Sequence, residues 1–176
     1  VITNNVRVFE NIPVSIPHQG ELTLRGEAFI KYSDFVKINR GIEDADAKYK
    51  NPRNLCSGTV RQLNNQVTAE RNVNFNAFGL VRGIDAETRE EELAWMADQG
   101  FDVVEHKVVT ADTLPESVQW FAEHIQDNDI PSDGLVLIFD DISYGSSLGA
   151  TSKFPRDSIA FKWRDEMKET TLTEIE

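Results

Sequence analysis

The sequence predicts an α+β fold in which antiparallel strands are flanked by helices. Three observations lead to this fold class. Several segments of strand length alternate apolar and polar side chains, two longer segments carry apolar side chains at helical spacing, and the two kinds do not follow one another as regular βαβ units. With 176 residues, 40% of them hydrophobic, the chain is long enough to form one globular domain with its own core.

The first strand is expected between residues 20 and 30. Alternation gives this strand two faces. The apolar face carries Leu22, Leu24, Ala28 and Ile30, and the mixed face carries Thr23, Arg25, Glu27 and Phe29. Ser33 is expected to cap a short helix that carries Phe35 and Ile38. Residues 41–50 are polar and are expected to form a loop, and residues 54–63 are expected to be helical.

A second strand is expected at residues 73–81, followed by a helix at residues 87–99 that ends at Gly100. Residues 101–109 are expected to be extended. Thr113 and Glu116 then form a capping-box pattern, with Pro115 in the first turn of the helix that follows.

Two more strands are expected at residues 134–139 and 158–163. In the last one, Ile159, Phe161 and Trp163 share a face that we expect to be buried, so Lys162 should lie on the opposite, open face. In the strand before it, Leu135, Leu137 and Phe139 form the more apolar face, and Ile138 is therefore expected to look away from the core.

Composition excludes some classes of protein. The net charge of −12 argues against a module that binds nucleic acid over a broad basic surface, unless basic residues gather locally. Candidates for such a local group are Arg25, Arg53, Arg61, Lys153, Arg156 and Lys162. The single cysteine, Cys56, is expected to pack in the core, and its isolation excludes an internal disulfide and a cysteine-rich zinc site. We expect no membrane contact and a cytoplasmic location.

Four segments occur in an order that resembles a known family: LRGEAFI (24–30), NPRNLCSGTVRQL (51–63), DGLVLIFDD (133–141) and SLGATSKFPRDSIAFKW (147–163). Together they resemble the later nucleotidyltransferase motifs of NAD-dependent bacterial DNA ligases. The resemblance implies a nucleotidyltransferase fold, as in DNA ligases and mRNA capping enzymes. It also implies that residues 1–176 form one domain, the part of the adenylation domain between the nucleophile and the approach to the OB-fold. Because residue 1 is Val, an excised domain is expected.

In that family, the lysine of a Lys-x-Asp-Gly motif attacks the α-phosphate of NAD. The AMP is then passed to the 5′-phosphate of nicked double-stranded DNA, and the nick is sealed during DNA replication and repair. The implied cofactors are NAD and Mg²⁺, and the implied partners are nicked DNA and the remaining ligase domains (NMN-binding, OB-fold, zinc finger and helix-hairpin-helix). The 176 residues contain no Lys-x-Asp-Gly sequence, so the chain alone is expected to be inactive.

The resemblance assigns catalytic roles to Lys162, Glu27 and Asp133. Lys162 matches a phosphate-contacting lysine, and on residue pattern alone it is a solvated surface lysine. Glu27 matches a glutamate that contacts the ribose; the simpler interpretation is an ion pair with Arg25 on the same strand face. Gly26, beside it, is expected to allow close approach of the nucleotide.

The remaining cofactor-binding assignments are Arg53, Arg61, Phe78 and Val136. If the segment between the two arginines is helical, they share one face and can bind phosphates, although two exposed surface arginines are the alternative. Phe78 stands where the family often has a tyrosine that stacks on adenine, and a core aromatic is the alternative. Val136 matches an apolar residue on the other side of the base.

Asp133 matches an aspartate linked to Mg²⁺, with contact through water because Mg²⁺ keeps several waters. The alternative is an ordinary turn residue within residues 131–134. One position departs from the family: Ile138 stands where many members carry a second phosphate-contacting lysine, and Lys153 is a candidate replacement.

Two rival functions stay open. One is a non-catalytic relative that binds nucleotide or DNA. The other is a nucleotidyltransferase with a different substrate, such as an ATP-dependent ligase or a capping enzyme. The Asn-Pro-Arg-Asn segment (51–54) and its spacing to Asp133-Gly134 argue against the second.

Overall fold

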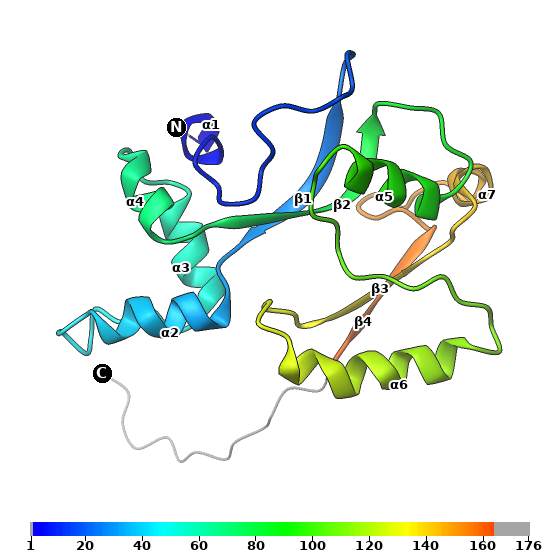
Figure 1. Ribbon diagram of the computed structural model, residues 1–176. Coiled ribbons are helices and arrows are strands. Elements are labelled where there is room, and N and C mark those ends of the chain that lie inside the picture. Colours follow the sequence, from blue (N-terminus) through cyan, green and yellow to red (C-terminus); the bar gives the residue numbers. More distant parts are fainter. Residues whose placement is uncertain (1, 164–176) are drawn as a thin grey trace.

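Two small antiparallel sheets form the framework of the molecule, which is seen here in a computed structural model that describes residues 2–163, with only the backbone of Gln126 (Figure 1). One sheet pairs β1 (Thr23–Phe29) with β2 (Asn74–Arg82), and the other pairs β3 (Gly134–Ile138) with β4 (Ser158–Lys162). The expected mixture of helices and antiparallel strands is therefore confirmed, and all four expected strands are present.

The helices lie around these sheets in two groups. Figure 1 shows the first four near one end of the β1–β2 sheet, and α5 to α7 on the side of β3 and β4. Their bounds are α1 (Ile2–Val6), α2 (Tyr32–Arg40), α3 (Pro52–Thr59), α4 (Asn65–Glu70), α5 (Arg89–Asp98), α6 (Leu114–His124), the 3-10 turn η1 (Ile125–Asp127) and α7 (Ile142–Ser147). Within the described residues, none of these helices is both long enough and apolar enough to cross a membrane.

The hydrophobic core consists of two clusters of buried residues. The first cluster includes residues of α3 and of the segments next to α1, β1 and β2: Phe9, Ile30, Leu55, Cys56 and Val73. The second cluster, between β2 and α5, consists of Ala77, Leu80 and Met96. The prediction that Cys56 packs in the core is confirmed, since it is only 5% exposed.

A bulge in β2 gives Phe78 an unusual position. Arg25 pairs with Gly79 and the next residue, Gly26, pairs with Ala77, so Phe78 is an extra residue on the longer strand. As a result Ala77 and Leu80 both reach the core against α5 although three positions separate them. Phe78 stays outside that core and is 50% exposed.

The predicted core face of β4 is wrong for the part of the chain that the structure describes. Ile159 and Phe161 are 67% and 41% exposed, because the sheet has only two strands and no described element covers these side chains. The opposite face is as expected: Lys162 pairs with Gly134, and Ile138 pairs with Ser158. Ile138 is 45% exposed, which confirms that it lies outside the packed core.

Several helix boundaries differ from the prediction because caps lie elsewhere. Ser33 lies inside α2, whose N-cap position is Lys31. Helix α3 begins earlier than expected, where Asn51 accepts a hydrogen bond from the Asn54 amide at 2.8 Å, and it ends at Thr59. The expected helix over residues 54–63 is therefore too long at its C-terminal end.

For α5 and α6 the capping box lies at a different helix from the one predicted. The capping box predicted at Thr113 and Glu116 is absent, because the Thr113 hydroxyl accepts instead from the amide of Thr110 at 2.9 Å. A capping box that was not predicted joins Thr88 and Glu91 at the start of α5. Gly100 follows α5 with φ +93°, as expected for a glycine at the end of a helix.

Candidate functional site

An ion pair between Asp133 and Lys162 lies at one end of the β3–β4 sheet. Asp133 immediately precedes β3 and Lys162 is the last residue of β4; their Oδ2 and Nζ atoms are 2.7 Å apart. Both side chains are mostly exposed, at 69% and 61%. Asp133 is therefore more than a plain turn residue, whereas Lys162 is a solvated surface lysine, as the simpler interpretation of the sequence expects, that also makes an ion pair.

The register of the two strands creates this pair. Gly134 lies opposite Lys162, and a side chain at position 134 would place its Cβ 2.2 Å from the carbonyl oxygen of Phe161. Glycine therefore lets β4 approach closely enough for Lys162 to reach the residue before Gly134. The pairing was missed in the sequence, although an antiparallel pairing of residues 134–139 with 158–163 would have indicated it.

Arg53, at the start of α3, contributes positive charge to the same place. The hydrogen bond from Lys162 lowers the pKa of Asp133, and the charges of Lys162 and Arg53 act in the same direction. Arg53 is exposed and stands in the first turn of α3, behind the cap at Asn51. Asn51 is a supporting residue that sequence reasoning missed, although an asparagine before a proline at the start of a helix is a usable signal.

Glu27 is exposed on β1, the strand against which α3 packs. Burial raises the pKa of the Cys56 thiol to about 11, and the negative charge of Glu27 acts in the same direction. Glu27 therefore lies near Cys56, one turn along α3 from Arg53. No ion pair joins Glu27 to Arg25 in the described part of the chain, so the simpler interpretation of Glu27 is not supported.

The structure gives a reason for glycine at position 26 that differs from the predicted close approach of the nucleotide. A Cβ at this position would lie 2.2 Å from Cζ of Phe75 and 2.4 Å from the carbonyl oxygen of Asn76. Because Gly26 pairs with Ala77, its missing side chain points to the core face of the sheet. Packing inside the protein is sufficient to require glycine here.

The apolar candidates Phe78 and Val136 are exposed on two different sheets. Val136 is 67% exposed and lies on the same face of its sheet as Lys162, since it pairs with Ala160 two positions away. Phe78 is exposed beside the pair formed by Arg25 and Gly79. Phe78 is thus not the core aromatic that its strand pattern alone would indicate.

Arg61 does not join Arg53 on a helix face. Helix α3 ends at Thr59, so Arg61 lies in the segment that follows, and the expectation of a shared helical face is wrong. Arg61 is exposed. The structure therefore pairs Asp133 with Lys162 at one end of the β3–β4 sheet, places Arg53 and Glu27 on α3 and β1, which pack together, and leaves Arg61 beyond the end of α3.

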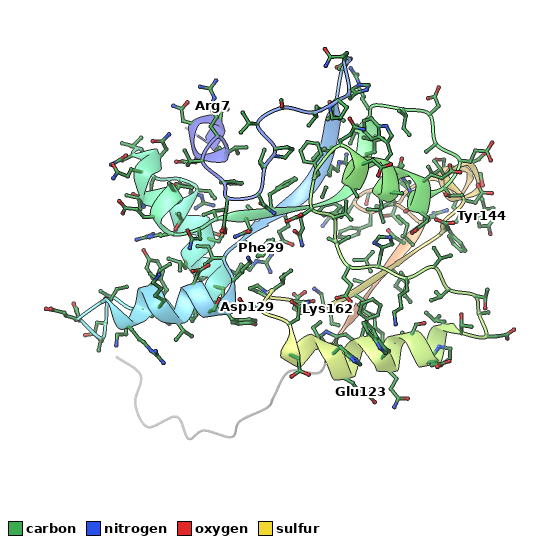
Figure 2. The ribbon with its side chains drawn as sticks, viewed as in Figure 1. Arg7, Phe29, Glu123, Asp129, Tyr144 and Lys162 are labelled. Atoms are coloured by element: carbon green, nitrogen blue, oxygen red, sulfur yellow. The ribbon has the colours of Figure 1, made fainter. Side chains whose placement is uncertain are left out.

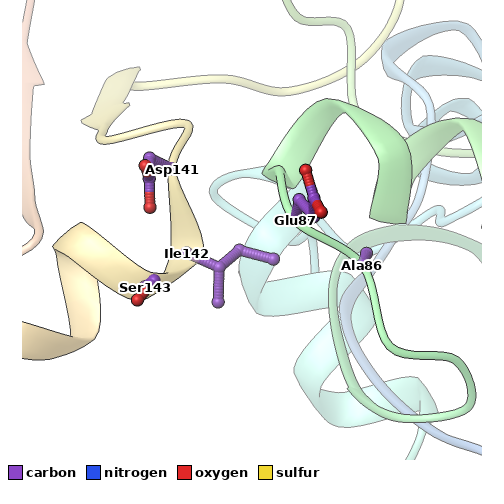
Figure 3. Close-up of a pocket in the computed structure, with 5 residues that line it drawn as sticks. All are labelled: Ala86, Glu87, Asp141, Ile142 and Ser143. Carbon is purple, nitrogen blue, oxygen red and sulfur yellow. The ribbon is translucent and has the colours of Figure 1, made fainter.

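A pocket of about 390 Å³ lies away from these residues (Figure 3). It is lined by Ala86, Glu87, Asp141, Ile142 and Ser143. Asp141 follows β3 whereas Asp133 precedes it, so the pocket and the ion pair lie at opposite ends of that strand. Between residues 2 and 163, no group of three or more His, Cys, Asp or Glu side chains is arranged to hold a metal ion.

Comparison with known proteins gives consistent results. The family described as NAD-dependent DNA ligase adenylation domain matches residues 1–166. Proteins named DNA ligase from Lachnoclostridium phytofermentans and Ruminiclostridium cellulolyticum are each 63% identical over 179 aligned residues, which cover 100% of this chain. A DNA ligase from Clostridium kluyveri is 36% identical over 180 residues and covers 99% of the chain. The chain spans 27% of the length of each of these relatives.

Proposed function

Because the chain belongs to the family of NAD-dependent DNA ligase adenylation domains, we propose that its charged site binds the adenylate of NAD and supports adenylyl transfer to nicked DNA. The observation that carries this proposal is the ion pair of Asp133 and Lys162, to whose effect on the pKa of Asp133 the charge of Arg53 adds a smaller contribution. Transfer of an adenylyl group depends mainly on positioning the phosphate and neutralising its charge. A lysine and an arginine beside one carboxylate suit that task.

The individual roles follow from chemistry and exposure. Lys162 and Arg53 would donate hydrogen bonds to phosphate oxygens. Glu27 would accept hydrogen bonds from the ribose hydroxyls. Phe78 and Val136 are half or more exposed, so both are open to the faces of an adenine ring. The residues present therefore fit the adenylate half of NAD.

Asp133 is the candidate for Mg²⁺. Its side chain is 69% exposed and is therefore open to a hydrated cation, but it is a lone carboxylate with Lys162 in contact. That arrangement fits a cation held through water together with substrate phosphates, and not one held by protein ligands alone. When bound, Mg²⁺ would neutralise part of the phosphate charge.

The wider context of the family is part of the proposal. We infer a nucleotidyltransferase fold for the domain to which residues 1–176 belong, with the predicted domain end falling among residues 164–176, outside the described residues. The proposed partners are nicked double-stranded DNA and the NMN-binding, OB-fold, zinc-finger and helix-hairpin-helix domains. The proposed setting is DNA replication and repair in the cytoplasm.

One observation favours a second function. Ile138 lies on the same sheet face as Lys162 and is exposed there, where the resemblance expects another phosphate-contacting lysine. An apolar side chain at that point weakens phosphate neutralisation. A relative that binds nucleotide or DNA without joining ends is therefore the alternative.

The test uses a chimaera in which this chain replaces the matching segment of the Lachnoclostridium phytofermentans DNA ligase. Formation of the enzyme–AMP adduct from NAD is measured in a single turnover. We expect Lys162→Ala and Glu27→Ala each to slow adduct formation, by on the order of 3 kcal/mol in transition-state stabilisation for a charge-assisted contact. Lys37→Ala and Glu43→Ala remove the same charges from exposed positions and should match the wild type.

The outcomes separate the two functions. If the chimaera forms the adduct and both site variants are slow, the catalytic proposal stands. If the chimaera forms no adduct but the 176-residue chain still binds AMP, the non-catalytic alternative is favoured. Wild-type rates in both site variants would show that the proposed site is wrong.

A further inference from the structure

The N-terminus of α2 is capped by a residue far away in the sequence. Asp129 accepts hydrogen bonds from the Ser33 hydroxyl at 2.6 Å and from the Ser33 amide at 2.8 Å, across 96 residues of chain. Its own carbonyl oxygen accepts a third from the amide of Tyr32 at 2.9 Å. The residue at the N-cap position, Lys31, makes no side-chain cap, so Asp129 takes over the task of capping α2.

The carboxylate of Asp129 is well suited to this contact. The hydrogen bond from the Ser33 side chain lowers the pKa of Asp129, the bond from the Ser33 amide acts in the same direction, and so does the charge of nearby Lys31. The group therefore stays ionised under ordinary conditions. A negative charge at a helix N-terminus is also stabilised by the helix dipole. The three bonds make one clamp, which we call the Asp129 clamp.

The clamp joins the two sheets next to the candidate site. Tyr32 follows the end of β1 at Phe29, and Asp129 precedes Asp133 by four residues. Figure 2 labels Phe29, Asp129 and Lys162, which in that view lie where β1, the segment before β3 and β4 come together. Glu27 belongs to the β1 side of the clamp, and the pair of Asp133 and Lys162 belongs to the other side.

The other contacts between these two sides that the described residues show gather at the opposite end of the β3–β4 sheet, where a bridge joins Thr88 to Asp141 and Arg89 pairs with Asp157. No strand pairing joins the two sheets within residues 2–163. The second tether lies at the far end of the β3–β4 sheet, where Asp140 accepts hydrogen bonds from the amides of Arg89 and Glu90 at the start of α5. The end that carries Lys162 therefore depends on the Asp129 clamp for its position relative to β1.

We propose that Asp129 is a positioning residue, whose clamp on Tyr32 and Ser33 holds Lys162 and Asp133 at the correct distance from Glu27. This inference rests on the proposed function. The ribose-binding side lies on the β1–β2 sheet and the phosphate-binding side on the β3–β4 sheet. Loss of the clamp should therefore displace Lys162 and Asp133, together with Val136 on the same sheet, relative to Glu27 on β1.

This geometry predicts a particular kinetic signature. A misplacement of about 1 Å at a reacting group can lower the rate on the order of a hundredfold. We expect Asp129→Ala to lower the single-turnover rate constant of adduct formation in the chimaera by about 10- to 100-fold. The NAD concentration at half-saturation should change less than the rate constant, because Glu27 and Phe78, on the β1–β2 sheet, are not moved. A residue that only stabilises the fold would instead reduce the amount of active enzyme.

Matched variants make the test specific. Asp127→Ala removes a carboxylate from an exposed position two residues earlier and should keep the wild-type rate. Ser33→Ala removes one bond of the clamp and should lower the rate less than Asp129→Ala. Ser33→Thr keeps both the hydroxyl and the amide and should restore the wild-type rate.

The failure of this inference is distinguishable from failure of the proposed function. If Lys162→Ala is slow and Asp129→Ala matches the wild type, the positioning role is wrong. If Asp129→Ala changes only the amplitude and the thermal stability, the residue is structural and the proposal is overturned. If Lys162→Ala and Glu27→Ala also have no effect, the proposed function fails. Amide hydrogen exchange in the 176-residue chain then tests whether Asp129 caps α2 in solution. Asp129→Ala must raise amide exchange at Ser33, whose amide donates to the carboxylate, whereas Tyr32 keeps its bond to the backbone carbonyl of residue 129. Unchanged exchange at Ser33 would refute the clamp.

Discussion

Asp129 and Asp133 are carboxyl groups whose folded-state pKa lies below the ordinary value of 3.8. Hydrogen bonds from Ser33 and from Lys162 are the main causes, and both bonds are lost when the chain unfolds. A lowered folded-state pKa means that the stabilisation is present above about pH 4 and is lost as the pH falls through the lowered value. The sign is therefore a loss of stability on acidification.

We predict that the free energy of unfolding of the 176-residue chain falls as the pH is lowered from about 4 through the lowered pKa values of Asp129 and Asp133. The variants Asp129→Asn and Asp133→Asn should each show a weaker pH dependence than the wild type, whereas Asp127→Asn should not. Urea unfolding at a series of pH values measures this. Equal slopes for Asp129→Asn and the wild type would contradict the lowered pKa of Asp129.

Gly26 and Gly79 provide a second prediction, since they lie in the same sheet with different surroundings. A Cβ at Gly26 would overlap Phe75 and the backbone of Asn76, whereas a Cβ at Gly79 would meet nothing within 4 Å. Overpacking of this kind costs roughly 1–3 kcal/mol. We expect Gly26→Ala to lower the free energy of unfolding by about that amount and Gly79→Ala to change it little. Denaturant unfolding of both variants tests the prediction, and equal losses would refute the packing explanation.

At the scale of elements, the strands and the longer helices were predictable from the sequence. Alternation identified β1 and β4, an apolar run of strand length identified β3, residues 73–81 were recognised as a strand candidate, and helical spacing identified α5 and α6. The short helices α1, α4 and α7 were not predicted, because five or six residues carry too little periodic pattern to be recognised. The bulge at Phe78 was also missed, because one extra residue in a strand depends on the partner strand and not on local sequence.

Caps were the least predictable feature, and α2 shows why. Ser33 has the chemistry of an N-cap, but its hydroxyl binds Asp129, which is 96 residues away. A local pattern cannot identify a partner at that distance. At Thr88 and Thr113 the local patterns compete with turns in the preceding loop, and only the first forms a capping box.

The exposed face of β3 allows a prediction about the stability of a lysine substitution on that strand. Val136 and Ile138 are exposed on the face that carries Lys162. We predict that Ile138→Lys leaves the free energy of unfolding within about 1 kcal/mol of the wild type, since an exposed lysine keeps its hydration. Ile30→Lys, at a position that is 0% exposed, should lower it by several kcal/mol. Thermal and urea unfolding compare the two, and a similar collapse in Ile138→Lys would show that Ile138 is buried in solution.

At the scale of the whole molecule, the candidate site is an assembly of elements that are distant in the sequence. Glu27 lies on β1, Arg53 lies on α3, and Asp133 and Lys162 lie at one end of the β3–β4 sheet. Helix α3 packs against β1, and we propose that the Asp129 clamp sets the position of the Asp133–Lys162 pair relative to Glu27. Residue patterns alone could not predict this arrangement, and each residue also had a simpler interpretation. The resemblance to a family selected the residues, but it did not predict that Asp133 and Lys162 form a pair or that Arg61 lies beyond the end of α3.

The last prediction concerns the reaction of the chain as a whole with NAD. The 176 residues contain no Lys-x-Asp-Gly sequence, and a covalent adenylate needs a nucleophile at the position where the family carries that lysine. We therefore expect the 176-residue chain to form no AMP adduct when it is incubated with NAD and Mg²⁺. Intact mass spectrometry measures the adduct, with the Lachnoclostridium phytofermentans ligase as the positive control. The charged site can still bind AMP without reacting, because Glu27, Arg53 and Lys162 are all present. A stable gain of one AMP on the chain would mean that another residue acts as the nucleophile.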